Sequence, residues 1–157
     1  MKFSPDGKYL LLVRGISRFG VDNKHIVKIE YATMKTQWLT PVDAACTEPA
    51  WSLDGKRIAY IACDDKRPVS ADEKDHDNVP DRVAQQHLWV MNENGTQKAQ
   101  LTNDTNYHEN APRWRKNGAE IEFERTTNPT MNQTRSLWAI GAEGKGLHWL
   151  KDLPPLE

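Results

Sequence analysis

Several features that would assign the chain to a specialised class of protein are scarce or absent. Its 157 residues include two cysteines, Cys46 and Cys63, which are too few and too widely spaced for a zinc ribbon or a CxxC redox motif. No apolar run approaches the roughly 20 residues that a membrane-spanning helix requires, and the residues after Met1 lack the charged, apolar and small-residue succession of a signal peptide. Lysines and arginines are scattered, and the formal net charge is -1, so no basic surface for nucleic acid is indicated. We expect neither a membrane span nor a nucleic-acid partner.

The composition supports a packed core that needs no metal and no disulfide. Hydrophobic residues make up 38% of the chain and charged residues 27%, values that are ordinary for a globular domain. A chain of this length buries roughly 68 to 70% of the surface that its unfolded form exposes. We therefore expect no cofactor, and the sequence leaves open whether Cys46 and Cys63 pair.

One phrase occurs three times along the chain, as FSPDGKYL at residues 3–10, WSLDGKRI at 51–58 and, in degraded form, WRKNGAEI at 114–121. Each copy has an aromatic residue, then a polar turn with glycine, then an apolar segment. Asp-Gly and Asn-Gly are strong signals for a tight hairpin, in which both turn residues can need positive φ. Self-similarity at a period of roughly 20 to 50 residues is typical of stacked modules.

Each copy predicts a unit of four antiparallel strands. A strand rich in β-branched and aromatic residues follows each turn, a second alternating strand comes next, and a shorter element ends the unit. The segment before each turn completes the unit as its first strand. The predicted segments are 9–14, 57–62 and 120–125 after the turns, 25–31, 87–92 and 136–140 next, 37–40, 99–102 and 148–150 at the ends, and 48–52 and 111–115 ahead of the second and third turns.

Three polar connections interrupt the units at the same place, between the second and third strands. Residues 64–86 are charged and almost free of large apolar residues, so they cannot contribute a packed strand. Residues 16–24 and 126–135 are shorter insertions at the corresponding positions. Because stacked repeats place corresponding insertions on one side, we expect all three loops to emerge on one face.

The segments FSPDGKYLLLVR, PAWSLDGKRIAYIA and LWVMNENGTQKAQLT resemble the PD40 (WD40-like) repeats of the TolB β-propeller family, which also occur in tricorn-type and prolyl-oligopeptidase-type proteins. The third unit keeps Ala111, Pro112, Trp114 and Gly118 but has Arg-Lys-Asn where the family has Ser-Pro-Asp. The resemblance covers residues 3 to 150 and implies an all-β propeller of four-stranded antiparallel blades. The expected blades, within one TolB-like segment spanning 1–157, are blade 1 at 1–41, blade 2 at 48–103 and blade 3 at 110–151.

The resemblance also implies that three blades are half of a ring, because propellers of this family close with six or more. A trio on its own leaves an apolar face open at each end, and large exposed apolar patches are rare on monomers. Three arrangements are compatible with the sequence. They are a fragment of a longer propeller, a homodimer in which two half-rings close one ring, and an open trio whose end blades are covered by loops.

The chain contains few groups arranged for catalysis or metal binding. Residues 15–20 approach the GxSxG nucleophile elbow, but Gly20 comes three residues after Ser17 instead of two, so no catalytic serine is predicted there. The acidic segment 72–81 offers carboxylate oxygens of the kind that calcium prefers, although it lacks the glycine and the spacing of an EF-hand. A solvated charged loop explains this segment better than a metal site does, and its weak calcium candidates are Asp72, Asp75, Asp77 and Asp81.

Recurring histidine and tryptophan positions indicate structural roles. His25 and His87 begin corresponding strands, and no HxH or HExxH spacing indicates a metal site. Tryptophans also recur at corresponding positions, so we expect them to pack between blades. The corresponding pairs are Trp51 with Trp114, Trp89 with Trp138, and Trp38 with Trp149.

The sequence shows no combination of nucleophile, base and orienting group that would argue for an enzyme. The TolB resemblance implies a non-catalytic interaction scaffold in the periplasm or another extracytoplasmic compartment, which binds protein partners through loops 16–24, 64–86 and 126–135. The alternative is a propeller segment of a larger prolyl-oligopeptidase-like or tricorn-like peptidase or hydrolase, which gates substrate to a catalytic domain outside this chain. Both hypotheses share one fold, so the fold alone does not separate them.

Overall fold

The computed structural model describes residues 1–15, 24–41, 45–63, 86–127 and 134–155. This part of the chain forms twelve strands and no helix, which agrees with the predicted all-β class. Accordingly, the described residues include no helix that is long and apolar enough to cross a membrane.

The strands form three four-stranded antiparallel sheets, each a meander in chain order. We call them blades 1, 2 and 3. Blade 1 contains β1 (Lys2–Phe3), β2 (Tyr9–Arg14), β3 (His25–Glu30) and β4 (Thr36–Trp38). Blade 2 contains β5 (Cys46–Trp51), β6 (Arg57–Cys63), β7 (Gln86–Asn92) and β8 (Ala99–Gln100). Blade 3 contains β9 (Tyr107–Trp114), β10 (Glu120–Thr127), β11 (Arg135–Gly141) and β12 (His148–Leu153).

The repeated phrase forms the turn between the first two strands of each blade. In blade 1 the Gly7 amide donates to the Ser4 carbonyl oxygen (2.9 Å), and the Asp6 carboxylate accepts from the Ser4 hydroxyl (2.6 Å) and the Lys8 amide (3.1 Å). Gly7 has a φ of 72°, whereas Asp6 is not among the described residues with positive φ. The expectation of positive φ at both turn residues is therefore wrong, because the aspartate caps a type I turn and only the following glycine is left-handed.

The innermost strands of blades 2 and 3 begin earlier than the sequence predicts. Glu48 and Ala111 occupy corresponding positions in β5 and β9, and both have a φ of 52°. The strand register shifts beside each of them, as expected for a β-bulge. A bulge breaks the alternation of side chains. The residues before it therefore lack the alternating pattern that predicts a strand.

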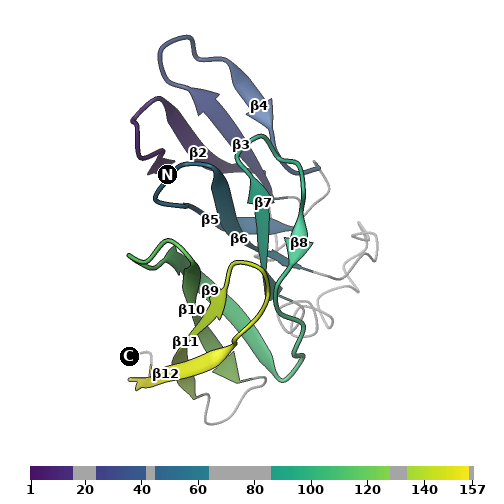
Figure 1. The fold of residues 1–157 in the computed structure, drawn as a ribbon. Coiled ribbons are helices and arrows are strands. Elements are labelled where there is room, and N and C mark those ends of the chain that lie inside the picture. Colours follow the sequence, from purple (N-terminus) through teal and green to yellow (C-terminus); the bar gives the residue numbers. More distant parts are fainter. Residues whose placement is uncertain (16–23, 42–44, 64–85, 128–133, 156–157) are drawn as a thin grey trace, which may run out of the picture.

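Blade 2 lies between blades 1 and 3 (Figure 1). Each contact between neighbouring blades, which we call a seam, has its own apolar core. Successive side chains of a strand point to opposite faces, so blade 2 contributes alternate residues to the two seams. The buried core of seam 1/2 contains Leu11, Ile26, Leu39, Cys46, Ile58, Tyr60, Ala62 and Met91. The buried core of seam 2/3 contains Ala59, Ile61, Leu88, Val90, Trp114, Ile121, Phe123, Ile140 and Ala142.

Tryptophans join the blades at only some of the predicted positions. The indole N–H of Trp51 donates to the Lys2 carbonyl oxygen (3.3 Å), and that of Trp114 to the Ala50 carbonyl oxygen (3.1 Å), so corresponding bonds cross both seams. Trp38 and Trp149, on the outermost strands, are 50% and 53% exposed. The expectation that they pack between blades is wrong, because an outermost strand lies at the rim of the seam.

The two outer faces of the trio differ in chemistry. On blade 1, the face turned away from blade 2 carries Phe3 and Tyr31, whose rings meet edge to face at 5.8 Å and which are 52% and 63% exposed. On blade 3, the corresponding outer face carries three glutamates of β10 that alternate with the buried Ile121 and Phe123. These glutamates pair with arginines of the same blade, as Glu120 with Arg115 (3.7 Å), Glu122 with Arg113 (3.0 Å) and Glu124 with Arg135 (2.5 Å).

Candidate functional site

The predicted interaction loops are anchored at corresponding positions of the three blades. The anchoring pairs of the second and third strands are Arg14 with His25, Cys63 with Gln86, and Thr126 with Arg135. Because the blades pack with corresponding residues side by side, these pairs lie at one end of the stack, which we call the loop-bearing face. Most of loops 16–24, 64–86 and 126–135 lies outside the described residues, so their own conformation stays a prediction.

A buried polar network lies at seam 2/3 beneath this face and centres on Glu109 of β9. One oxygen of Glu109, Oε2, accepts from the Leu88 amide (2.8 Å) and from the Thr102 hydroxyl. The other, Oε1, accepts from the Arg125 guanidinium at 2.9 Å. His87 lies 3.9 Å from the same carboxylate, through its Nδ1. All five residues are buried, so the network is closed to solvent.

Arg125 is also enclosed by aromatic rings. Its guanidinium carbon lies 5.0 Å from the ring centroids of Tyr107 and Trp138 and 5.7 Å from that of Phe123. A desolvated cation is attracted to ring faces by roughly 2 kcal/mol or more. The carboxylate and the rings together offset the cost of burying this charge.

Seam 1/2 has a different chemistry at the same place. The Thr40 hydroxyl accepts from the Ile26 amide (2.9 Å), just as Thr102 accepts from Leu88 (2.9 Å). However, Cys46 pairs across the strands with Ala62 at the position where Glu109 pairs with Arg125. Burial, partly offset by a hydrogen bond with Thr40, raises the pKa of the Cys46 thiol to about 11. This thiol therefore stays protonated and unreactive near neutral pH.

The network ties blades together and is not arranged for catalysis. Glu109, Arg125 and His87 are at most 3% exposed, so a substrate has no access to them. Sequence reasoning missed the network because its members come from three strands, β7, β9 and β10, and from the connection after β8. The available signal was the threonine that ends units one and two, at Thr40 and Thr102.

The serine and the acidic residues singled out in the sequence lie outside the described part of the chain. They are Ser17 and the calcium candidates Asp72, Asp75, Asp77 and Asp81. The described part of the chain brings together no three His, Cys, Asp or Glu side chains that could hold a metal ion. Cys46 and Cys63 are both thiols.

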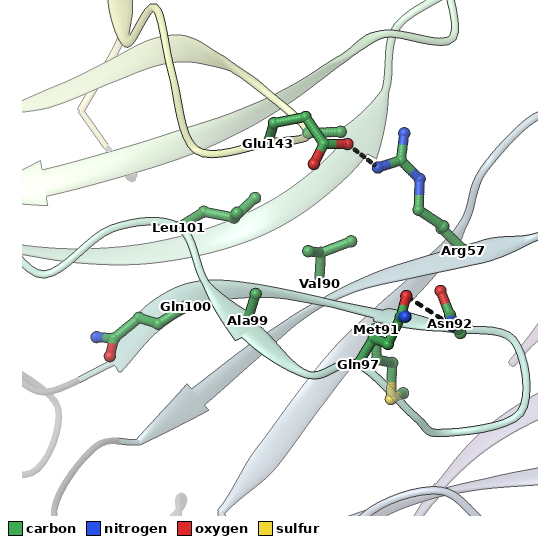
Figure 2. Close-up of a pocket in the computed structure, with 10 residues that line it drawn as sticks. Arg57, Val90, Met91, Asn92, Gln97, Ala99, Gln100, Leu101 and Glu143 are labelled. Carbon is green, nitrogen blue, oxygen red and sulfur yellow. Dashed lines mark hydrogen bonds and ion pairs between the residues drawn. The ribbon is translucent and has the colours of Figure 1, made fainter.

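A cavity of about 310 Å³ opens at the outer rim of seam 2/3 (Figure 2). Its apolar wall is formed by Val90, Ala99, Leu101 and other residues, and the Arg57–Glu143 ion pair (2.7 Å) crosses one side of it. Arg57 also lies over the Trp114 ring, at 5.0 Å from its centroid. The full lining is Arg57, Val90, Met91, Asn92, Gln97, Ala99, Gln100, Leu101, Ala142 and Glu143.

Comparisons with known proteins identify the fold and no closer relationship. No protein-family model and no curated protein matches the sequence. Among solved structures, a TolB candidate protein from Agrobacterium tumefaciens superposes with a TM-score of 0.71 at 17% identity, over 96% of this chain and 48% of that one. TolB from Acinetobacter baumannii superposes with a TM-score of 0.62 at 13% identity, over 91% of this chain and 30% of that one. The tricorn protease superposes with a TM-score of 0.65 at 9% identity, over 96% of this chain and 18% of that one.

The three sheets are thus blades of a β-propeller. Their fold is that of the TolB and tricorn propellers, as the repeated segments predicted, and at these identities the likeness concerns the fold alone. The chain spans about half of the Agrobacterium protein and smaller shares of the other two.

Proposed function

We propose that the chain is part of a non-catalytic β-propeller scaffold that binds a protein partner through its loop-bearing face. The observation that supports this proposal most is the shared anchoring of three insertions at corresponding strand ends. Residues that bind partners are concentrated on loops that a rigid framework positions. A partner would therefore contact several loops at once.

The strand ends that anchor the loops contain buried residues, which hold them in place. Arg125 and Thr126 precede the end of β10 and are buried. His25 is the first residue of β3 and His87 the second residue of β7, and both are buried. Buried anchors restrict the motion of the loop ends, which lowers the entropy lost on binding. The TolB likeness supports a periplasmic or other extracytoplasmic location for this activity.

Deletion of residues 66–84 tests the loop-bearing face. The deleted protein should keep the circular dichroism spectrum of a β-protein, because the strands that flank the loop are held by both seams. It should lose chemical cross-linking to the partner that the intact chain captures from an extract of its own organism. A matched control is Trp149→Ser on β12, which removes a half-exposed aromatic side chain from the outermost strand. Capture of the same protein by the deletion variant would remove loop 64–86 from the proposal.

A propeller segment of a larger peptidase is the second candidate. It is favoured by the superposition on the tricorn protease, of which this chain covers 18%. An antibody against the chain distinguishes the two candidates in the organism that encodes it. A peptidase would appear as a polypeptide several times longer that carries peptidase activity into the precipitate. A scaffold would precipitate without such activity.

A further inference from the structure

We propose that the cavity at seam 2/3 is a binding site for an uncharged aliphatic side chain presented by a polypeptide, of leucine or isoleucine type. The inference deepens the proposed function, on which its biological role rests, although the site lies at the rim of the seam and not on the loop-bearing face. The argument starts from the corresponding space at seam 1/2, which the chain fills with its own residues.

At seam 1/2 the space is filled by a lysine. Lys28 occupies the fourth position of β3, and only 7% of its surface is exposed. Its ammonium group donates to the carbonyl oxygen of Glu93 (2.8 Å), pairs with the Glu93 carboxylate and lies 4.9 Å from the Tyr9 ring centroid. Beside it, the Gln37 amide donates to the Asn94 carbonyl oxygen (3.0 Å).

At seam 2/3 the side chains that correspond to Lys28, Glu93 and Gln37 are all shorter. Strands β3 and β7 align at His25 and His87, which places Val90 where blade 1 has Lys28. The amides of Glu93 and Ala142 donate to the carbonyl oxygens of Lys56 and Ala119, both at 2.9 Å, so Ala142 stands where blade 2 has Glu93. The outermost strands align likewise, so that Ala99 corresponds to Gln37. The cavity is the space that these three changes leave.

The size of the cavity suits part of a ligand. A volume of about 310 Å³ is far larger than the roughly 30 Å³ that one water molecule occupies in the liquid. It lies at the lower end of the range of ligand pockets, about 300 to 1,000 Å³. One aliphatic side chain with its flanking peptide groups fits this volume.

The charge of the lining selects an uncharged occupant. A second lysine is disfavoured, because Ala142 removes the carboxylate that holds Lys28 and Arg57 replaces the aromatic ring of Tyr9. An anion is disfavoured as well, because Arg57 is already paired with Glu143. Burying an unpaired charge is costly, whereas an apolar side chain gains from contact with the apolar wall.

The polar part of the lining suits peptide groups. The carboxamides of Asn92 and Gln97 meet at this wall, where Asn92 Nδ2 donates to Gln97 Oε1 (3.1 Å). This bond uses one donor and one acceptor of the pair, and the Asn92 oxygen and the Gln97 amide nitrogen supply a further acceptor and a further donor. Peptide groups have the same combination of donor and acceptor, so these side chains match the backbone on either side of an aliphatic residue. This places a polypeptide, and not a simple hydrocarbon, in the cavity.

The test is a nuclear magnetic resonance titration of the intact chain with N-acetyl-leucine amide, N-acetyl-lysine amide and N-acetyl-aspartate amide. The leucine probe should shift the methyl signals of Val90, Ala99, Leu101 and Ala142 in a saturable way, with a dissociation constant on the order of millimolar for a ligand this small. The lysine and aspartate probes should bind at least tenfold more weakly. Equal binding of all three, or no saturable shift, would overturn the proposal.

The matched variant carries Val90→Lys and Ala142→Glu, which copies the filled arrangement of seam 1/2 into seam 2/3. It should bind the leucine probe at least tenfold more weakly than the natural chain, and unchanged binding would overturn the proposal. If this variant does not fold, Ala99→Gln makes the same test at an exposed strand. Because the probes need no partner protein, loss of capture in the loop deletion and loss of probe binding here are separate outcomes.

Discussion

At the scale of single residues, Ser52 holds the repeated turn of blade 2 together. Its hydroxyl donates to Asp54 (2.7 Å) and accepts from the Arg57 amide (2.9 Å), and Asp54 also accepts from the Lys56 amide (3.1 Å). These bonds, that of the Ser52 hydroxyl first, lower the pKa of the Asp54 carboxyl. The sequence predicted this turn from Asp-Gly but not its φ angles, because the capping bonds depend on a serine two residues earlier.

Ser52→Ala is expected to destabilise the chain by about 1 to 3 kcal/mol near neutral pH, because the Arg57 amide loses its acceptor. The loss should depend on pH. The folded pKa of Asp54 lies below its unfolded value of about 3.9, so the stability contributed by the carboxylate is present above that value and is lost as pH falls through the folded pKa. Urea unfolding should show the variant and the natural chain converging as pH falls. A difference that is the same at about pH 7 and about pH 3 would exclude the carboxylate from the effect.

At the scale of the strand, β9 and β10 carry a charge pair where β5 and β6 carry Cys46 and Ala62. The strands themselves could be predicted from their alternation and from the turns that bound them. The pair of Glu109 with Arg125 could not, because a strand pattern does not tell which polar residue faces a neighbouring sheet. Its partners across the seam, Leu88 and Thr102, become neighbours only once the blades have stacked.

Glu109→Leu is expected to cost about 3 to 5 kcal/mol, because it leaves the Arg125 charge buried without its carboxylate. Arg125→Met should cost a similar amount for the converse reason. The double variant should be less destabilised than the sum of the two, since no charge remains buried. Urea unfolding of the four proteins measures this coupling. Additive losses would show that the pair contributes nothing beyond its two separate members.

At the scale of the whole molecule, the two outer faces do not complement each other. A homodimer that closes a ring would set the glutamate row of blade 3 against Phe3 and Tyr31 of blade 1. It would also lack an indole bond of the kind that crosses both seams, because Phe3 stands where the other blades have Trp51 and Trp114. The sequence alone could not separate the three ring arrangements, since it did not reveal that the arginines and glutamates of blade 3 pair within the blade.

Association of the chain in solution is therefore expected to use the apolar outer face of blade 1 only. Light scattering at high protein concentration should give a mass above that of one chain. Leu12→Arg should lower this mass, because Leu12 follows the seam residue Leu11 in β2 and therefore lies on the outer face. Glu122→Lys on the outer face of blade 3 should leave the mass unchanged, because that face is polar and satisfied within its own blade. A decrease with both variants would instead support ring closure through blades 1 and 3.

The difference between the buried centres of the two seams has a consequence for folding. Repeat proteins are prone to misassembly, in which a module docks on the wrong neighbour. A blade 3 that docked on blade 1 would bury Glu109 beside Thr40 and Ile26, and would leave blade 2 without a place in the stack. Blade 2 of a second chain that docked in place of blade 3 would present its Cys46 to Thr102 of the first, and the Leu88 amide would lose its carboxylate acceptor. The unlike seams thus favour one order of assembly among blades that share the same four-stranded arrangement.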